Sequence, residues 1–271
     1  MIATAQQDID GAYAAAQCVV QTHQRLAEFL RAGLTLAEID RFAAETLSSL
    51  DCRSAFLRYR MRGYPPFPSH ACLSLNECIV HGTHHMTAEP IKPGDVLKID
   101  IGVTHHGWIG DAAWTYAIEE VSEDAQRLMA CGRESLRRGI ATMQMDRPLI
   151  DWATAVQTYV EGECGFHLVR GLGGHGYGRK LHGPPFLSNV VPTQPREWPD
   201  AWLTFKPGML LAVEPMVAVG TGEIASGGDQ QWPIRTADGS LAVHYEADVL
   251  ITEDGPRDLT EGLDELPDVV G

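Results

Sequence analysis

The segment KIDIGVTHHGWIGDAAW, residues 98–114, decides the fold because it is typical of two apolar strands around a turn. Residues 96–103 are rich in Val, Ile and Leu, as strands are. A hairpin folded about residues 105–106 would place Asp100 directly opposite Asp111, with Cβ atoms about 5 Å apart. Two like charges on one half-buried face are destabilising. We therefore expect either that one carboxyl group is protonated or that a cation lies between the two. The alternative, that one aspartate belongs to the turn and faces solvent, is disfavoured because neither residue lies at the turn.

Composition and charge exclude several classes of protein. The chain has 271 residues, 44% hydrophobic and 21% charged, which is enough for a large globular core. No apolar run reaches about 18 residues, and residues 1–17 lack the pattern of a signal peptide, so we expect a cytoplasmic protein without a membrane span. The net charge of −15 argues against DNA or membrane binding. A basic run at residues 58–62 is expected to be a solvated loop, with RNA contact as the alternative.

The cysteines give no metal or redox motif. None belongs to a CxxC pair, which excludes a zinc ribbon and a thioredoxin-like site. In a cytoplasmic protein they are expected to be reduced thiols. The six are Cys18, Cys52, Cys72, Cys78, Cys131 and Cys164.

Helices, strands and loops can be assigned along the chain from the periodicity of its hydrophobic residues and from the positions of Gly and Pro. A capping box, Thr35 to Glu38, opens the second helix. The predicted helices span residues 5–31, 35–50, 122–143 and 149–162. Besides the hairpin, the predicted strands span residues 71–75, 209–218 and 243–251. A surface loop is expected at 183–200, and a loose acidic end from residue 252.

An internal repeat links the two halves of the chain. Residues 92–100, KPGDVLKID, and residues 206–214, KPGMLLAVE, both read K-P-G-x-[VL]-L-x-[IV]-[DE] and end in an acid. Asp111 and Glu246 lie on the strands that follow. Coincidence is the alternative, but the matched acids favour two αβ halves that each contribute two carboxylates.

Four converging carboxylates need a counter-charge. Two divalent metal ions would balance them and suit oxygen ligands. The softer ligand is expected to be His175, since the glycines of segment 173–178 allow a close backbone approach. His182 follows seven residues later.

These motifs resemble type I methionine aminopeptidases of the pita-bread metallopeptidase superfamily. The resemblance covers residues 64–259, and the motifs follow the family's order. It rests on Ser74-Leu-Asn-Glu77, His81-Gly82, Asp100, Asp111, Gly174-His-Gly-x-Gly-Arg-x-x-His182, Glu214-Pro-Met216 and Tyr245-Glu246.

The resemblance implies an α+β fold of two pseudo-symmetric αβ halves, with a central curved antiparallel sheet and helices on its outer face. It implies one catalytic domain over residues 1–271. Within it we assign N-terminal helices to 1–60, the first half to 61–145, the second half to 146–255 and an acidic tail to 256–271.

The implied activity is metal-dependent removal of the initiator methionine from nascent proteins and peptides with a small second residue. Two divalent ions (Co, Mn, Fe or Zn) would be held, with Asp111 and Glu246 bridging them. The implied ligands are Asp100, Asp111, His175, Glu214 and Glu246. Partners would be nascent polypeptide N-termini and, transiently, the ribosome, and we expect a monomer.

Catalytic roles follow from the same resemblance. Glu214 would accept the proton of the attacking water, and His182 would stabilise the oxyanion. His81 would hydrogen-bond the scissile amide. The substrate pocket, suited to an unbranched thioether, would be lined by Tyr64, Phe67, Cys72, His81, Leu181, His182 and Trp232.

The chain departs from the family pattern at four positions near the site. They are Gly102 in place of Thr, Gly183 in place of Glu, His244 in place of Gln, and the additional Asp248. Asp-x-Gly at residues 100–102 is similar to the Xaa-Pro peptidase branch, which is the alternative function, along with a non-catalytic binding relative. The histidine pairs 84–85 and 105–106 are expected in a loop and at a hairpin tip, not as ligands.

Overall fold

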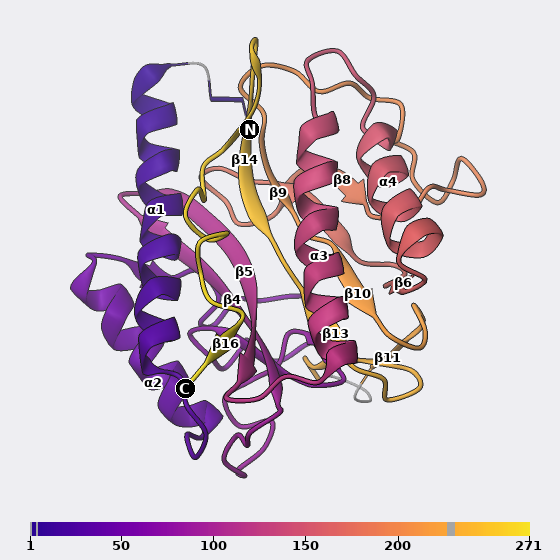
Figure 1. The fold of residues 1–271 in the computed structure, drawn as a ribbon. Helices are drawn as coiled ribbons and strands as arrows, with labels where there is room; N and C mark the ends of the chain where they lie inside the picture. Colours follow the sequence, from indigo (N-terminus) through magenta and orange to yellow (C-terminus); the bar gives the residue numbers. More distant parts are fainter. Residues whose placement is uncertain (1, 4, 227–230) are drawn as a thin grey trace.

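The computed structural model describes residues 2–3, 5–226 and 231–271, and it contains two αβ halves side by side (Figure 1). Two helices cover each half, and the strands form the layer behind them. The helices are α1 (Gln6–Phe29), α2 (Leu36–Ser49), α3 (Glu123–Thr142) and α4 (Ile150–Gln157), which continues into a π-helical turn, Thr158–Glu163. The predicted helices are confirmed to within a few residues at each end, except that the last turn of the fourth is π-helical.

Helix α2 begins with the predicted capping box. The Thr35 side chain accepts a hydrogen bond from the backbone N–H of Glu38 at 3.3 Å, and the backbone N–H of Thr35 donates to the Glu38 carboxylate at 2.8 Å. Two of the N–H groups at the helix start are thereby satisfied.

We expect Thr35→Ala to lower the free energy of unfolding by about 1 kcal/mol, because the first turn of α2 loses its cap. Chemical denaturation of the two proteins measures the difference. Ser48→Ala, at an exposed position of the same helix, serves as the comparison, and an equal loss in both variants would contradict a specific capping role.

Within the described residues, the strands form two five-stranded and two three-stranded sheets. The first large sheet contains β1 (Arg53–Ser54), β2 (Cys72–Leu75), β4 (Val96–His105), β5 (Trp108–Ile118) and β16 (Val269–Val270). The second contains β7 (Gly173–Gly176), β8 (Gly183–Ser188), β9 (Leu210–Val213), β14 (Ala247–Thr252) and β15 (Gly255–Asp258). The small sheets are β3 (Cys78–Val80) with β11 (Ile224–Ser226) and β12 (Ile234–Thr236), and β6 (His167–Leu168) with β10 (Met216–Ala218) and β13 (Ala242–His244).

The β4–β5 hairpin exists, but its predicted register is wrong by two residues. Asp111 lies opposite Gly102, so Asp100 is its diagonal neighbour on the same face of the sheet. The reason is the turn: His106 and Gly107 are its central residues, with φ of 47° and 81°. Such a type I′ turn requires positive φ at both positions, and a glycine at the second one favours it. The two carboxylates still share a face, as the argument required.

The internal repeat is visible in the backbone. In each copy the residue after the glycine donates its N–H to the carbonyl of the lysine, Asp95 to Lys92 and Met209 to Lys206, both at 3.1 Å. The glycines between them have φ of 86° and 85°. Equal turns therefore start β4 and β9, and each strand delivers its acid at the same distance along the chain.

The two halves are joined where β5 meets β14. The Asp111 N–H donates to the Asp248 carboxylate at 2.8 Å, and the Glu246 N–H donates to the carbonyl of Ala113 at 2.9 Å. These bonds cross the boundary between the halves. They bring an acid of the first half next to an acid of the second.

Two sequence predictions about irregular segments are wrong. Residues 183–188 form strand β8, because a strand at the edge of its sheet tolerates prolines, and β8 is such an edge strand. The C-terminal segment is not loose: β15 pairs with β14, and β16 pairs parallel to β5. Figure 1 shows this segment running between α1 and α3. Apolar side chains among the acids, such as Leu259 and Leu263, are buried and hold it.

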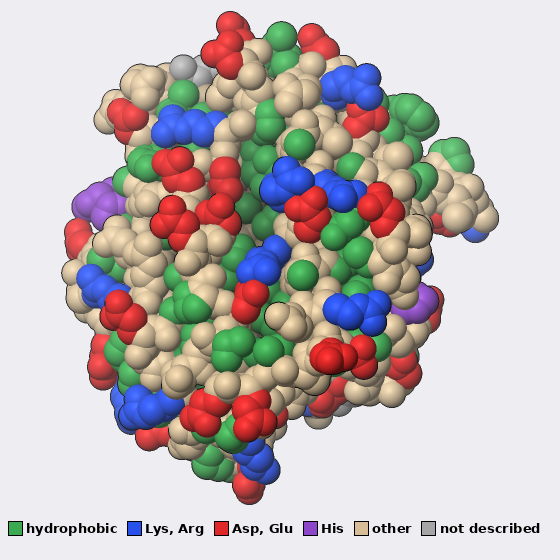
Figure 2. Space-filling model, in the orientation of Figure 1, with side chains coloured by type: hydrophobic (Ala, Val, Ile, Leu, Met, Phe, Trp, Pro, Cys, Tyr) green, Lys and Arg blue, Asp and Glu red, His purple; other side chains and the backbone are tan. Residues whose placement is uncertain are grey.

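The helix-covered face carries charges of both signs. Figure 2 shows Lys and Arg interspersed with Asp and Glu over this face, with apolar side chains between them. Within the described part of the chain, no helix has the length and apolar character that a membrane crossing needs.

Candidate metal centre

The five predicted ligands lie around one cavity of about 290 Å³. Asp100 belongs to β4 and Asp111 to β5, in the first half. In the second half His175 belongs to β7, Glu214 follows β9, and Glu246 precedes β14. The pseudo-symmetric halves therefore deliver their acids to a common point.

The ligand atoms fall into two overlapping groups. One oxygen of Asp111, one nitrogen of His175 and one oxygen of Glu246 lie within 4.8 Å of one another. In a second group, ligand atoms of Asp100, His244 and Glu246 also lie within 4.8 Å of one another. Glu246 belongs to both, which is the position that a bridging carboxylate occupies. Glu214 lies beside the second group, with its Oε2 3.3 Å from the Nε2 of His244.

Glycines next to His175 allow strand β7 to enter this site. A Cβ atom at Gly174 would lie 2.3 Å from the carbonyl oxygen of Ala212, and one at Gly176 would lie 2.1 Å from that of Pro184. Any larger residue would push the backbone away from its neighbours. The predicted close approach is therefore required by the packing on both sides.

Burial dominates the electrostatics of the acids. It raises the pKa of Asp100 to about 7 and that of Glu214 to about 8. The pKa values of Asp111 and Glu246 are raised well above the usual range, first by burial and then by the other carboxylates. Burial lowers the pKa of His175 to about 3, so its imidazole is neutral and free to act as a ligand. The site therefore disfavours uncompensated negative charge.

Unpaired polar atoms show that the residues fit bound cations. Within the described residues, Oδ1 of Asp100, Oδ1 of Asp111 and Nε2 of His244 are buried without a hydrogen-bond partner. Such atoms are costly unless something compensates them. Divalent ions would bind the two carboxylate oxygens and would neutralise the acids, so the donor set, with His175, suits metal ions with oxygen and imidazole ligands.

The departures from the family pattern lie close to these atoms. His244 is buried, with Nε2 3.8 Å from Glu246 Oε2, and it was not among the predicted ligands. Asp248 holds the backbone of Asp111 through the hydrogen bond described above. A Cβ atom at Gly102 would lie 2.3 Å from the Phe56 ring, so a threonine there would require this ring to move. Nothing in the structure explains Gly183.

His81 and His182 both line the cavity. His81 has a φ of 57°, an uncommon conformation for a non-glycine residue. Burial lowers its pKa to about 4. Nδ1 of His182 lies 2.7 Å from the Tyr59 hydroxyl, and the ring of His182 packs 4.4 Å from that of His175, centroid to centroid.

The apolar wall of the cavity contains four of the predicted pocket residues, namely Phe67, Cys72, Leu181 and Trp232. Tyr64 is not among the lining residues; its ring packs against Trp232 with centroids 5.0 Å apart. Sequence reasoning missed three lining residues, Phe56, Tyr59 and Met61. Tyr59 and Met61 alternate with arginines in residues 58–62, which we expected to form a solvated loop. This alternation could have indicated that the two side chains line the cavity.

Comparisons with known proteins agree with this geometry. The sequence profile of metallopeptidase family M24 matches residues 10–253. Methionine aminopeptidase 1 of Mycobacterium tuberculosis is 35% identical over 260 residues, which cover 94% of this chain and 93% of that protein.

Solved structures give the same result. Methionine aminopeptidase from Rickettsia prowazekii superposes with a TM-score of 0.87 at 28% identity, covering 96% of this chain and 100% of that one. X-Pro aminopeptidase from Thermotoga maritima superposes with a TM-score of 0.72 at 19% identity, covering 99% of this chain and 65% of that one, and shares the fold alone. The expected pita-bread fold is confirmed, and the chain belongs to metallopeptidase family M24.

Proposed function

We propose that this chain is a methionyl aminopeptidase, which removes the initiator methionine from nascent proteins and peptides whose second residue is small. The observation that carries the proposal is a buried set of four carboxylates and one histidine at the end of an apolar cavity. The methionine aminopeptidases that match nearly the whole chain support it. Such a protein acts on new polypeptides, so we propose a cytoplasmic location.

Two divalent ions would be held by Asp100, Asp111, His175, Glu214 and Glu246. Divalent ions at such a centre lower the pKa of a water molecule and polarise the scissile carbonyl. Cobalt, manganese, iron and zinc all suit this donor set, and availability decides among them. Asp248 and His244 orient the ligands from behind, as such partners do in metal sites.

The remaining roles belong to side chains of this chain. Glu214 would accept the proton of the attacking water, once bound cations have displaced the proton that burial otherwise favours on its carboxyl group. His81 hydrogen-bonds the scissile amide. A bond donated by Tyr59 to Nδ1 of His182 leaves the His182 proton on Nε2, which donates it to the developing oxyanion. The apolar wall, with Phe67, Cys72, Leu181 and Trp232, receives the methionine side chain, and Tyr64 supports Trp232.

Peptide hydrolysis after chelator treatment, with and without added Mn²⁺ or Co²⁺, tests the proposal. The substrates are Met-Gly-Met-Met, Leu-Gly-Met-Met and peptides that begin with Met-Pro. Metal-dependent release of methionine alone supports it. Preferential cleavage before proline in peptides that begin with other residues would indicate the Xaa-Pro activity instead. No turnover of any peptide, with metal shown to bind, would indicate a binding protein.

We expect Tyr59→Phe to lower kcat about fivefold and to leave KM nearly unchanged, because one hydrogen bond that orients His182 is worth about 1 kcal/mol. Tyr13→Phe removes a tyrosine hydroxyl that bonds to Glu261 on the surface, and it should leave both constants unchanged. Equal rates for wild type and Tyr59→Phe would remove Tyr59 from the mechanism. Ribosome contact and a monomeric state stay predictions.

A further inference from the structure

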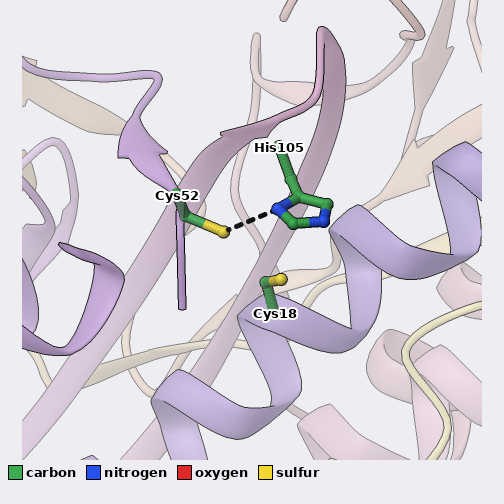
Figure 3. Close-up of side chains that lie close together, drawn as sticks. All are labelled: Cys18, Cys52 and His105. Atoms are coloured by element: carbon green, nitrogen blue, oxygen red, sulfur yellow. Dashed lines mark hydrogen bonds between the residues drawn. The ribbon is translucent and has the colours of Figure 1, made fainter. Parts of the chain in front are cut away.

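Two cysteines and a histidine meet outside the catalytic cavity (Figure 3). Cys18 comes from the middle of α1, Cys52 follows the end of α2, and His105 ends β4. One sulfur atom from each cysteine and one ring nitrogen lie within 4.8 Å of one another. None of the three lines the catalytic cavity. The three residues, called here the Cys₂His cluster, lie far apart in the sequence, so no spacing motif could indicate them.

Regular backbone structure places the members of this cluster. The N–H of Cys52 donates to the carbonyl of Leu47 at 2.9 Å, the bond that closes a Schellman motif at the end of a helix. The next residue, Arg53, pairs with Thr104 across β1 and β4, which sets Cys52 beside His105. Ligands on such elements are held more accurately than ligands on free loops.

The distances suit a tetrahedral ion. The Cys52 sulfur lies 3.5 Å from Nδ1 of His105. Zinc bonds of about 2.3 Å to sulfur and about 2.0–2.1 Å to nitrogen would place these two ligands about 3.6 Å apart at a tetrahedral angle. Hydrogen bonding between the two thiols lowers the pKa of Cys18 and raises that of Cys52, so the two sulfur atoms already interact. Both cysteines are buried, whereas His105 is partly exposed and offers an entry route.

We propose that Cys18, Cys52 and His105 bind a thiophilic divalent ion of the zinc class. Binding releases one proton from each thiol to solvent, and the imidazole binds through the lone pair of a ring nitrogen. The ion, two thiolates and one imidazole then have no net charge, which suits a buried site. Three protein ligands leave a fourth position that water can fill.

This site would act on stability and not on peptide cleavage. It connects α1, the end of α2 and the tip of the β4–β5 hairpin, which are far apart in the sequence. Its sulfur ligands favour zinc, whereas the oxygen-rich catalytic centre also accepts harder ions. Part of the zinc measured in the purified protein would therefore be bound at this site, and its amount would not correlate with catalytic activity.

Cobalt titration of the reduced, metal-free full-length chain tests the proposal. Thiolate coordination to Co²⁺ produces a charge-transfer band in the near ultraviolet. Oxygen and imidazole ligands do not produce this band. We expect the band in wild type, in Cys164→Ser and in Cys72→Ser, the last of which removes the thiol beside the catalytic acids. We expect it to be lost in Cys18→Ser and Cys52→Ser and weakened in His105→Asn, with zinc content lower by one ion per chain.

Circular dichroism establishes that each variant is folded before it is titrated. Methionine release by Cys52→Ser with added Mn²⁺ should equal that of wild type, which separates this site from the catalytic one. The proposal would be overturned by a band that persists in the Cys18→Ser/Cys52→Ser double variant, or by no band in wild type. A Cys18–Cys52 disulfide as the main form of the protein as purified would also overturn it.

Discussion

Asp111→Asn should reduce metal-dependent release of methionine by about a thousandfold or more. Asp111 belongs to the group of ligand atoms with His175 and Glu246, and an amide supplies a weaker, neutral ligand in its place. Metal ions contribute several kcal/mol to transition-state stabilisation, and each 1.36 kcal/mol is worth about tenfold in rate. Initial rates on Met-Gly-Met-Met at saturating Mn²⁺ measure the effect.

The matched control for this substitution is Asp254→Asn, an equal change at an exposed turn, and it should keep the wild-type rate. The metal content of both variants should be measured alongside the rates. A variant at position 111 that keeps its metal and more than a tenth of its activity would exclude Asp111 as a bridging ligand. The other four ligands would then have to be re-examined by the same assay.

Without metal, the protein should lose stability as the pH rises. Burial raises the pKa of Asp100 to about 7 and that of Glu214 to about 8 in the folded state, above the values near 4 of unfolded chains. The folded state therefore holds protons that the unfolded state releases. This contribution is fully present below about pH 4 and is lost as the pH rises through about 7–8.

The effect is on the order of several kcal/mol, so the melting temperature of the chelated protein should fall by many degrees between about pH 5 and about pH 9. The stabilisation by added Mn²⁺ should grow over the same range, because metal binding requires deprotonated ligands. Calorimetry with and without chelator measures both. Asp100→Asn should show a shallower fall, and a melting temperature that rises with pH in the chelated protein would contradict the linkage.

Local chemistry accounts for what could be predicted from the sequence. The capping box at Thr35, the two KPG turns and the apolar strands after them depend on residues that are neighbours in the chain. The repeat placed an acid at the end of each first strand, and it therefore predicted which carboxylates would converge. The predicted register of the β4–β5 hairpin was wrong by two residues because the turn is centred on His106 and Gly107, which both have positive φ.

Longer-range contacts decided the rest. In the sequence, the motifs in their order indicated the family and its two-halved fold by resemblance, and the repeat indicated that the acids would converge, because turns, apolar strands and motifs are properties of short segments. Only the tertiary structure showed that Tyr59 contacts His182, that the C-terminal segment pairs with β5 and β14, and that Cys18, Cys52 and His105 meet. These contacts join residues that are distant in the chain, and packing between whole helices and strands, which no local pattern encodes, brings them together.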